Sequence, residues 1–359
     1  MLNFGFIGFG QVGGIFADNA KSLGYKALAF NTAKVDLQGL SELDSEEKTH
    51  LAGFEGAGKD RGIGEEAFLE HQDLIRGGIE EQFKHAHVLF PVFAIGGGTG
   101  SGMAGNVVRM LTDTFQTKVV SPILFLPDEE ESLRAKMNAL EAFTDISSIE
   151  EIGTTFMIDN QQVMNLYESH PLHEKYERSR IDFLTGLHAF NQTTDKKSPI
   201  SNLDSMDLLT VLSERGQGMI TEAPLSKEEA KDPEQLAKRM NHASSFGIHA
   251  KNNLQHISKS ATLYNIPTAW TASLKPEAYL HNLGLPLETF TGIYESERSD
   301  IAALFTGLPF PSSILKRYEE TIKENEKQVI SSLNHVRSQT YDAKQNWTKD
   351  LKRKRRIKM

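Results

Sequence analysis

The chain has 359 residues, enough for one large or two ordinary domains with buried cores. It contains no cysteine, which excludes a disulfide framework and a cysteine-ligated metal site and fits a reducing compartment such as the cytoplasm. Six positive charges lie between Lys352 and Lys358, and removing those six from the net charge of −9 leaves −15 on the rest of the chain. An acidic body with a basic end is typical of a protein that uses its tail for interactions.

The sequence gives no indication of secretion or membrane insertion. Residues 1–7 carry neither a basic region nor a cleavage site, and no stretch of about 18 apolar residues occurs. We therefore expect neither a signal peptide nor a membrane-spanning helix.

Short apolar segments alternate with helical patterns in the first half of the chain, which predicts a parallel α/β sheet. The predicted strands are residues 2–7, 27–31, 88–95, 119–126 and 155–158. The predicted helices are residues 12–23, 64–86, 102–115 and 132–149. Because ligands of such sheets bind beyond the carboxyl ends of the strands, the polar loops that follow these strands are the first places to look for a site.

The second half has a different pattern. A predicted helix over residues 171–190 and a polar stretch over 191–205 lead into a smaller α+β region. Its predicted strands are residues 219–222, 261–266, 290–294 and 301–306. After Pro311, apolar residues recur at every third or fourth position, which predicts an amphipathic helix of about 30 residues.

The predicted fold class is therefore α/β, with a doubly wound parallel-sheet domain, a central helix, a smaller α+β second domain and a long C-terminal helix. The predicted boundaries are 1–170 for the first domain, 171–204 for the central helix and the loop after it, 205–311 for the second domain, 312–350 for the C-terminal helix and 351–359 for the basic tail.

The loop over residues 8–14 satisfies the G-x-G-x-x-G fingerprint of dinucleotide-binding proteins. Glycines allow backbone N–H groups to approach phosphate oxygens at the start of a helix. An NAD(P)-binding Rossmann oxidoreductase is therefore one hypothesis. Such enzymes carry Asp or Glu at the end of the second strand to bind the ribose, whereas this chain has Asn31 there, which weakens that hypothesis.

Two further glycine-rich segments are candidates for phosphate-binding loops. Residues 53–60 almost spell a P-loop, but Asp60 follows Lys59 where the motif requires Ser or Thr, so we reject that site. Residues 96–102 lie between a predicted buried strand and a predicted helix, and their five glycines, one Thr and one Ser suit an anion-binding loop. A flexible linker is the alternative, but it would not interrupt an α/β pattern at this point.

A pair of carboxylates, Asp204 and Asp207, lies three residues apart at the predicted start of a helix. Residues at that spacing share one helix face, so the pair could hold a water molecule and a cation together. The alternative is that Asp204 caps the helix and Asp207 lies in its first turn.

The run Gly96-Gly97-Gly98-Thr99-Gly100-Ser101-Gly102 resembles the GGGTGSG signature of the tubulin/FtsZ family, and other segments over roughly residues 2–215 follow in the family's order. The first phosphate loop is matched by Gly10, Gln11, Val12 and Gly13, the second by Asn31, and the third by Gly56, Ala57 and Gly58. Glu130 and Arg134 fall in the family's fifth loop, and Asn160 and Asp182 fall where the family contacts the ribose or the base. The resemblance implies GTP or GDP as the ligand, with Mg²⁺, and no separate metal site built from side chains.

The segment that starts at Asn202 resembles the family's synergy loop, NxDxxDxxTV. The resemblance implies that Asn202, Asp204 and Asp207 complete the catalytic site of the adjacent subunit. It also implies a head-to-tail homopolymer whose GTPase activity is switched on by polymerisation. One departure concerns Arg180, which lies near the position of the family's guanine-reading Asp or Asn but can only donate hydrogen bonds.

Residues 306–311, the long helix and the basic tail are similar to the TubZ branch of the family, which is carried by plasmids and phages. That similarity implies dynamic filaments in the bacterial cytoplasm that segregate or position DNA. The partner would be a TubR-like DNA-binding adaptor, or DNA itself, at the basic tail. A DNA-binding module that works through this tail without nucleotide is the remaining alternative.

Overall fold

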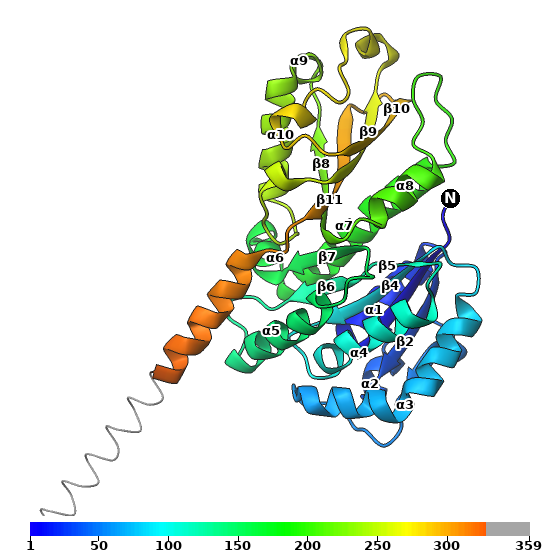
Figure 1. Ribbon diagram of the computed structural model, residues 1–359, viewed down its shortest axis with the longest axis vertical. Helices are drawn as coiled ribbons and strands as arrows, with labels where there is room; N and C mark the ends of the chain where they lie inside the picture. The colour runs from blue at the N-terminus through cyan, green and yellow to red at the C-terminus, as the bar shows by residue number, and fades with distance from the viewer. Residues whose placement is uncertain (328–359) are drawn as a thin grey trace, which may run out of the picture. The chain divides into compact units, whose positions relative to one another are not determined.

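One mixed sheet of eleven strands runs through the first 312 residues, which form a single compact unit in the computed structural model (Figure 1). The structure describes residues 1–327. The strand order is β10-β9-β11-β8-β7-β6-β4-β1-β2-β3, and β5 pairs with β4 beside this path. Within the described part of the chain, no helix is both long enough and apolar enough to cross a membrane.

The first half of the sheet is entirely parallel. Its strands are β1 (Phe4–Phe9), β2 (Lys26–Asn31), β3 (Lys48–His50), β4 (Val88–Ala94), β5 (Val119–Val120), β6 (Ile123–Leu126) and β7 (Thr154–Asp159). The helices between them are α1 (Gly10–Ser22), α2 (Lys34–Gln38), α3 (Arg61–Gln82), α4 (Thr99–Thr114), α5 (Leu133–Ser147) and α6 (Asn160–Leu166). The chain builds outward from β1 to β3, returns to β4 and builds the other way, so the doubly wound fold is confirmed. The reversal lies between β1 and β4, which is where such sheets bind ligands.

The helix α7 (Leu172–Thr193) connects this half to the second region. That region contains α8 (Ser205–Leu212), β8 (Gly216–Pro224), α9 (Lys227–Lys231), α10 (Pro233–Ser245), β9 (Lys259–Ile266), β10 (Glu288–Glu295) and β11 (Asp300–Leu308). The described residues also contain four short 3₁₀ helices, one in the first half at Ser45–Glu47 and three in the second region at Leu254–His256, Thr268–Ser273 and Leu280–Asn282. Strand β8 is parallel to β7, whereas β11 is antiparallel to both β8 and β9. The expected central helix and mixed second region are therefore present.

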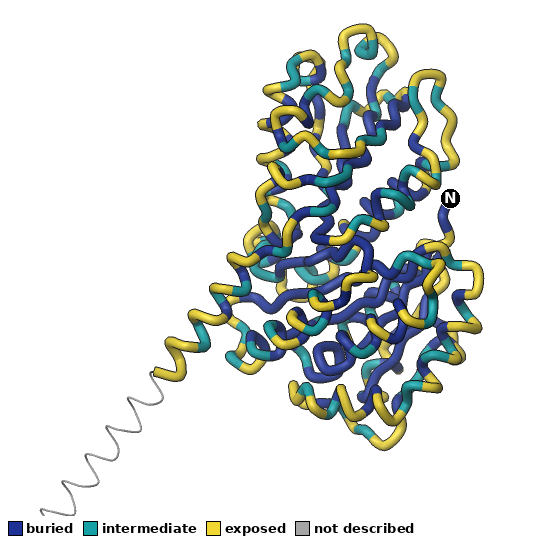
Figure 2. Tube along the Cα trace, in the orientation of Figure 1, coloured by how far each residue is buried: buried dark blue, intermediate teal, exposed yellow. Residues whose placement is uncertain are grey.

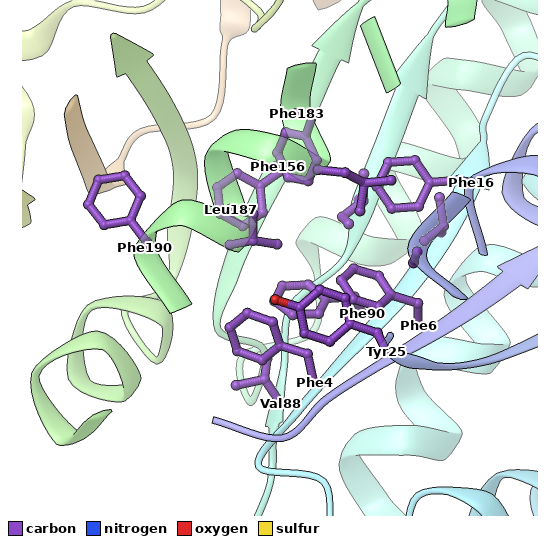
Figure 3. Packing of buried hydrophobic residues seen from close by; sticks show 14 of the residues in the cluster. Phe4, Phe6, Phe16, Tyr25, Val88, Phe90, Phe156, Phe183, Leu187 and Phe190 are labelled. Carbon is purple, nitrogen blue, oxygen red and sulfur yellow. The ribbon is translucent and has the colours of Figure 1, made fainter. Parts of the chain in front are cut away.

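Aromatic side chains fill the core between the sheet and its helices (Figure 3). Phe6 stacks on Phe90 with ring centroids 5.0 Å apart, and Phe156 of β7 meets Phe183 of α7 edge-on at 5.0 Å. These contacts attach α7 firmly to the parallel sheet, since each buried ring contributes about 1.5–3 kcal/mol through the hydrophobic effect. A second apolar cluster lies entirely within residues 219–308. Figure 2 shows the buried strands and the exposed outer helices and loops.

The structure differs from the predicted elements in a few places. The single strand expected over residues 119–126 is split into β5 and β6 at Ser121 and Pro122, and proline has no N–H to continue a ladder. The short helices α2 and α6 were not predicted. The predicted boundaries at 170 and 205 interrupt no strand, and β7 pairs directly with β8, so the domain division stays a prediction. Residues 312–327 are helical; the rest of the expected C-terminal helix and the basic tail lie outside the described residues.

Candidate nucleotide-binding site

A cavity of about 450 Å³ opens at the carboxyl ends of the parallel strands, beside the start of α7. The ends of β4, β6 and β7 contribute Ala94, Gly96, Gly97, Phe125, Pro127, Glu131 and Asn160. Helix α1 contributes Gln11, Val12 and Ile15, the third loop contributes Lys59, and α7 contributes His173, Tyr176, Ser179 and Arg180. The lining therefore combines bare glycine backbone at Gly96 and Gly97 with apolar side chains and with polar side chains, four of which come from α7.

The glycine run has two different structural roles. A Cβ added at Gly98 would lie 2.6 Å from the Cβ of Ala57, and one added at Gly102 would lie 2.2 Å from the carbonyl oxygen of Arg61. These two glycines let the loop over residues 96–102 pack closely against Ala57 of the third loop and against Arg61 at the start of α3. At Gly97 an added Cβ would make only one ordinary contact, at 3.5 Å, and this residue lines the cavity. Gly97 therefore leaves space for a ligand, whereas Gly98 and Gly102 are required by packing.

Helices α1 and α4 both start at this cavity, at Gly10 and Thr99. Gly10 has φ of 74°, a conformation that favours glycine, and its Cα lies next to the backbone of Gly100. The first N–H groups of a helix have no partner within the helix and carry partial positive charge. Two helix starts at one cavity favour a ligand with several negative charges, such as a triphosphate.

Side chains fix the loops in place from behind. The amide of Asn138, a buried residue of α5, donates to the carbonyl oxygens of Lys59, Gly96 and Gly97 at 3.0, 3.3 and 2.9 Å. The hydroxyls of Thr32 and Thr99 are 2.7 Å apart, and the hydroxyl of Ser101 donates to the carbonyl oxygens of Gly97 and Gly98. Asn138 was not among the predicted site residues, and its only signal in the sequence is a polar residue on the buried face of an amphipathic helix.

Several predicted residues support the loops without lining the cavity. Asn31 shapes the second loop, because its Oδ1 accepts from the N–H of Ala33 and its Nδ2 donates to Asp36, both at 3.0 Å. In the third loop Gly56 has φ of 98°, and its N–H donates to the carbonyl oxygen of Thr32 at 3.1 Å. Ala57 and Gly58 belong to the same turn, which is packed against the glycine run.

The acidic fifth loop is folded around Asp128, whose Oδ1 accepts from the N–H groups of Glu130 and Glu131, both at 2.9 Å. This turn directs Glu131 into the cavity and leaves the predicted ligand Glu130 exposed and outside the cavity lining. Burial, reinforced by the charge of Asp128, raises the pKa of Glu131. The ammonium of Lys136 donates to the carbonyl oxygens of Glu129 and Glu131 at 2.8 Å and holds the turn closed.

Arg134 also lies elsewhere than predicted. Its side chain pairs with Asp60 at 3.4 Å and lines a separate depression between α3 and α5. By contrast, Lys59, rejected as a P-loop lysine, does line the cavity, and it has φ of 64°. Its position therefore comes from a strained turn in the third loop and not from a P-loop.

Helix α7 presents Tyr176, Ser179 and Arg180 to the cavity. Asp182, two residues further on, is rotated by about 200° around the helix axis and therefore points away. It accepts a hydrogen bond from Tyr167 and lines a different cavity with Glu222 and His249. Asp182, which the sequence placed among the nucleotide ligands, therefore does not line this cavity. Burial, followed by the charges of Asp128 and Glu131, raises the pKa of Tyr176 to about 12.

The cavity contains two polar groups whose hydrogen-bonding capacity is unused. Within residues 1–327, the Nε of Arg180 and the Oδ1 of Asn160 are buried and have no hydrogen-bond partner. Burial also lowers the pKa of Arg180, because the charged guanidinium is partly removed from water. Buried polar groups without partners in a cavity indicate that a polar ligand completes the site.

The three residues predicted to be catalytic lie together but away from this cavity. Asp204 caps α8, and its Oδ1 accepts from the N–H groups of Met206 and Asp207 at 2.7 and 2.9 Å. The Oδ2 of Asp207 accepts from the N–H of Asp204 at 3.0 Å, which completes a capping box. Asn202 exchanges hydrogen bonds with the backbone of Ser198. The capping interpretation is therefore realised within the subunit, and the carboxylates remain near solvent.

The cavity and the Asn202–Asp207 loop are separated by the length of α7. The start of α7 lines the cavity, whereas Ser205 meets Thr194 just beyond its last residue, with the two hydroxyl oxygens 3.3 Å apart. Near that same end, the side chain of Asn191 accepts from the N–H of Leu2 and donates to its carbonyl oxygen, and Leu2 precedes β1 whereas Gly10 follows it. Arg180, the cavity residue furthest along α7, precedes Thr194 by 14 residues, or about 21 Å of helix, so the two sites lie well apart in one molecule.

Fold and site together define an α/β protein with a polyphosphate-binding cavity at the topological switch point of a doubly wound sheet. Residues 7–168 match the family model described as "Tubulin/FtsZ family, GTPase domain". This match covers the first, parallel half of the sheet and agrees with the resemblance seen in the glycine run over residues 96–102.

Known relatives come from two branches of this family. The chain is 25% identical over 238 residues to the tubulin-like protein CetZ of Pyrococcus abyssi, covering 65% of this chain and 63% of that protein. It is 26% identical over 234 residues to the tubulin-like protein TubZ of Bacillus cereus, covering 60% of this chain and 53% of that protein. The matches thus span between half and two-thirds of the length of these relatives. The identities are too similar to assign the chain to the CetZ or the TubZ branch.

The fold is also that of solved structures. A GTPγS-form protofilament of TubZ from Bacillus thuringiensis serovar israelensis aligns with a TM-score of 0.78 at 19% identity, over 92% of this chain and 94% of that chain. This likeness establishes the architecture from the parallel sheet through the second region.

Proposed function

We propose that the protein is a GTPase that assembles head-to-tail into filaments and completes each catalytic site between two subunits. The observation that carries this proposal is the separation of the nucleotide cavity from Asp204 and Asp207 along α7. Because one molecule cannot bring these groups together, the carboxylates can act only on nucleotide held by another copy. A head-to-tail contact that does not close into a ring produces a filament.

In this proposal the triphosphate lies against Gly96, Gly97 and the starts of α1 and α4. Glu131 and Asn160 lie where the ribose would be placed, and the base lies beside α7. Mg²⁺ fits such a site because it is held largely by phosphate oxygens and water with one or two protein groups. When bound, it would neutralise charge on the phosphates.

The neighbouring subunit would supply the groups that orient the attacking water. Phosphoryl transfer is catalysed mainly by positioning and charge stabilisation, and an oriented carboxylate can accept the proton of the nucleophile. Burial, together with the charge of Asp204, raises the pKa of Asp207, which suits a group that accepts a proton. The capping box fixes both carboxylates before assembly, so little ordering is needed when the interface forms.

A role in DNA segregation or positioning is a finer proposal within this one. It is supported by the six positive charges between Lys352 and Lys358, which would bind a polyanion or an adaptor–DNA complex in a salt-dependent way. In a filament each subunit would present one tail, and avidity would strengthen the interaction. Loss of DNA or adaptor binding on deletion of residues 351–359, with assembly retained, is the expected result.

The test of the main proposal is 90° light scattering with simultaneous phosphate release after addition of GTP, ATP or NAD with Mg²⁺. We expect scattering to rise with GTP alone, and turnover per molecule to increase with protein concentration. Tight NAD binding without assembly would instead support an oxidoreductase, and turnover that is independent of concentration would contradict a site shared between subunits.

A further inference from the structure

Arg180 lines the nucleotide cavity from α7, the helix beside which the proposed function places the base. The lining also includes Tyr176, one turn earlier on the same face of α7, and the apolar side chains of Val12, Ile15 and Phe125. The Nε of Arg180 is buried, and no group in the described residues accepts its hydrogen. A guanidinium held beside apolar groups with an unused donor is therefore available to the edge of a base.

The hydrogen-bonding character of Arg180 restricts what it can read. A guanidinium only donates, in a fixed fork that matches two adjacent acceptors. Guanine presents such a pair in O6 and N7, whereas adenine presents N7 next to the N6 amino group, which is itself a donor. The N1–H and N2 amino groups of guanine face a different edge and cannot bond to a guanidinium.

We infer that Arg180 determines purine specificity by donating to O6 and N7 of the base. This inference rests on the proposed function, because it assigns the base-reading residue of the same nucleotide site. It makes the 6-oxo group and N7 the features that are selected and leaves the N2 amino group without a role in selection. Inosine triphosphate, which retains O6 and N7 but lacks the N2 amino group, would then bind nearly as well as GTP.

Two side chains in the cavity that can accept hydrogen bonds, Glu131 and Asn160, lie outside α7. Glu131 follows β6, and its carboxylate receives a hydrogen bond from the side chain of Asn160 at the start of α6. If one of these acceptors read the base instead, it would bond to N1–H and the N2 amino group. The two assignments therefore predict opposite rankings for the same set of nucleotides.

The first experiment uses the unmodified full-length protein below its assembly concentration. GTP, ITP, 7-deaza-GTP and ATP compete with a ribose-labelled fluorescent GTP analogue. We expect ITP within about threefold of GTP, and 7-deaza-GTP and ATP weaker by roughly 5- to 150-fold, the range for a bidentate contact to a base. An ITP affinity as poor as that of ATP, or a 7-deaza-GTP affinity equal to that of GTP, would overturn the inference.

The second experiment compares Arg180→Lys with Arg178→Lys, a matched change at an exposed residue on the same helix. Lysine keeps the positive charge but cannot form the bidentate contact. We expect the GTP-to-ATP affinity ratio to fall at least fivefold in Arg180→Lys and to stay unchanged in Arg178→Lys. An unchanged ratio in Arg180→Lys refutes the inference and leaves the proposed function intact, whereas absence of any triphosphate binding by the unmodified protein refutes the proposed function itself.

Discussion

Replacing Asp204 separates its structural role from its proposed catalytic role. Its carboxylate accepts two backbone hydrogen bonds, at 2.7 and 2.9 Å, so Asp204→Ala removes the N-cap of α8 and should cost about 1 kcal/mol of unfolding free energy. Asparagine caps helices as well as aspartate does, so Asp204→Asn should lower the unfolding free energy by only about a few tenths of a kcal/mol. That loss arises mainly because a negative charge no longer interacts with the helix dipole. Both changes remove the carboxylate that we propose orients the attacking water, and both should lower GTP turnover in filaments by about 100-fold or more.

The assay combines urea unfolding followed by circular dichroism with phosphate release from sedimented filaments. Asp113→Asn, at an exposed position of α4, serves as a control for the loss of one surface charge. We expect filaments of Asp204→Asn to form with GTP and to persist, because hydrolysis is slowed while the loop keeps its shape. If Asp204→Asn hydrolysed GTP at the normal rate while Asp204→Ala did not, Asp204 would be only a helix cap, and the reasoning would be wrong.

Three further predictions concern the loops and a buried histidine. Gly98→Ala should destabilise the fold and abolish nucleotide binding, since its Cβ would lie 2.6 Å from Ala57, whereas Gly97→Ala should weaken binding with little change in unfolding free energy. Asn138→Ala should lower nucleotide affinity about tenfold and stability by about 1–3 kcal/mol, measured by titration and urea unfolding, because three loop carbonyls lose their donor. Burial lowers the pKa of His249 from 6.5 to about 4. The unfolded state therefore binds the proton first as the pH falls, so the free energy of unfolding should drop by roughly 3 kcal/mol between pH 6.5 and pH 4 and be unaffected by this histidine above pH 6.5. His249→Gln should remove that part of the pH dependence; an unchanged pH profile would show that the histidine is not responsible.

The sequence could predict the strands and the glycine loops because both depend on local patterns. Buried parallel strands appear in the sequence as runs of apolar residues. The close contacts around Gly98 and Gly102 leave no room for a side chain, so these positions must be glycine. Which of the predicted residues line the cavity depends on geometry that residue types do not encode. A turn around Asp128 decides that Glu131, and not Glu130, faces the cavity.

Helical phase explains why Asp182 lines a different cavity from Arg180, because a shift of two residues on α7 moves a side chain to the opposite face. Asn138 could not be predicted since its three partners are about 40 and 80 residues away in the chain, and only the fold brings them together. The separation of the cavity from Asp207 likewise required the length and attachment of α7, which the sequence could suggest only through a family resemblance.

The claim that the active site is shared between molecules is tested most directly by mixing two inactive variants. Gly97→Asp places a carboxylate where the phosphates would bind but leaves Asp204 and Asp207 intact, and Asp207→Asn binds GTP but lacks the neighbour's carboxylate. Each variant alone should hydrolyse GTP poorly. Mixed in equal amounts, they should recover up to about one quarter of the unmodified protein's rate, because one in four random head-to-tail contacts joins a GTP-bound subunit to an intact loop. A mixture whose phosphate release equals only the average of the two separate variants would contradict the shared site.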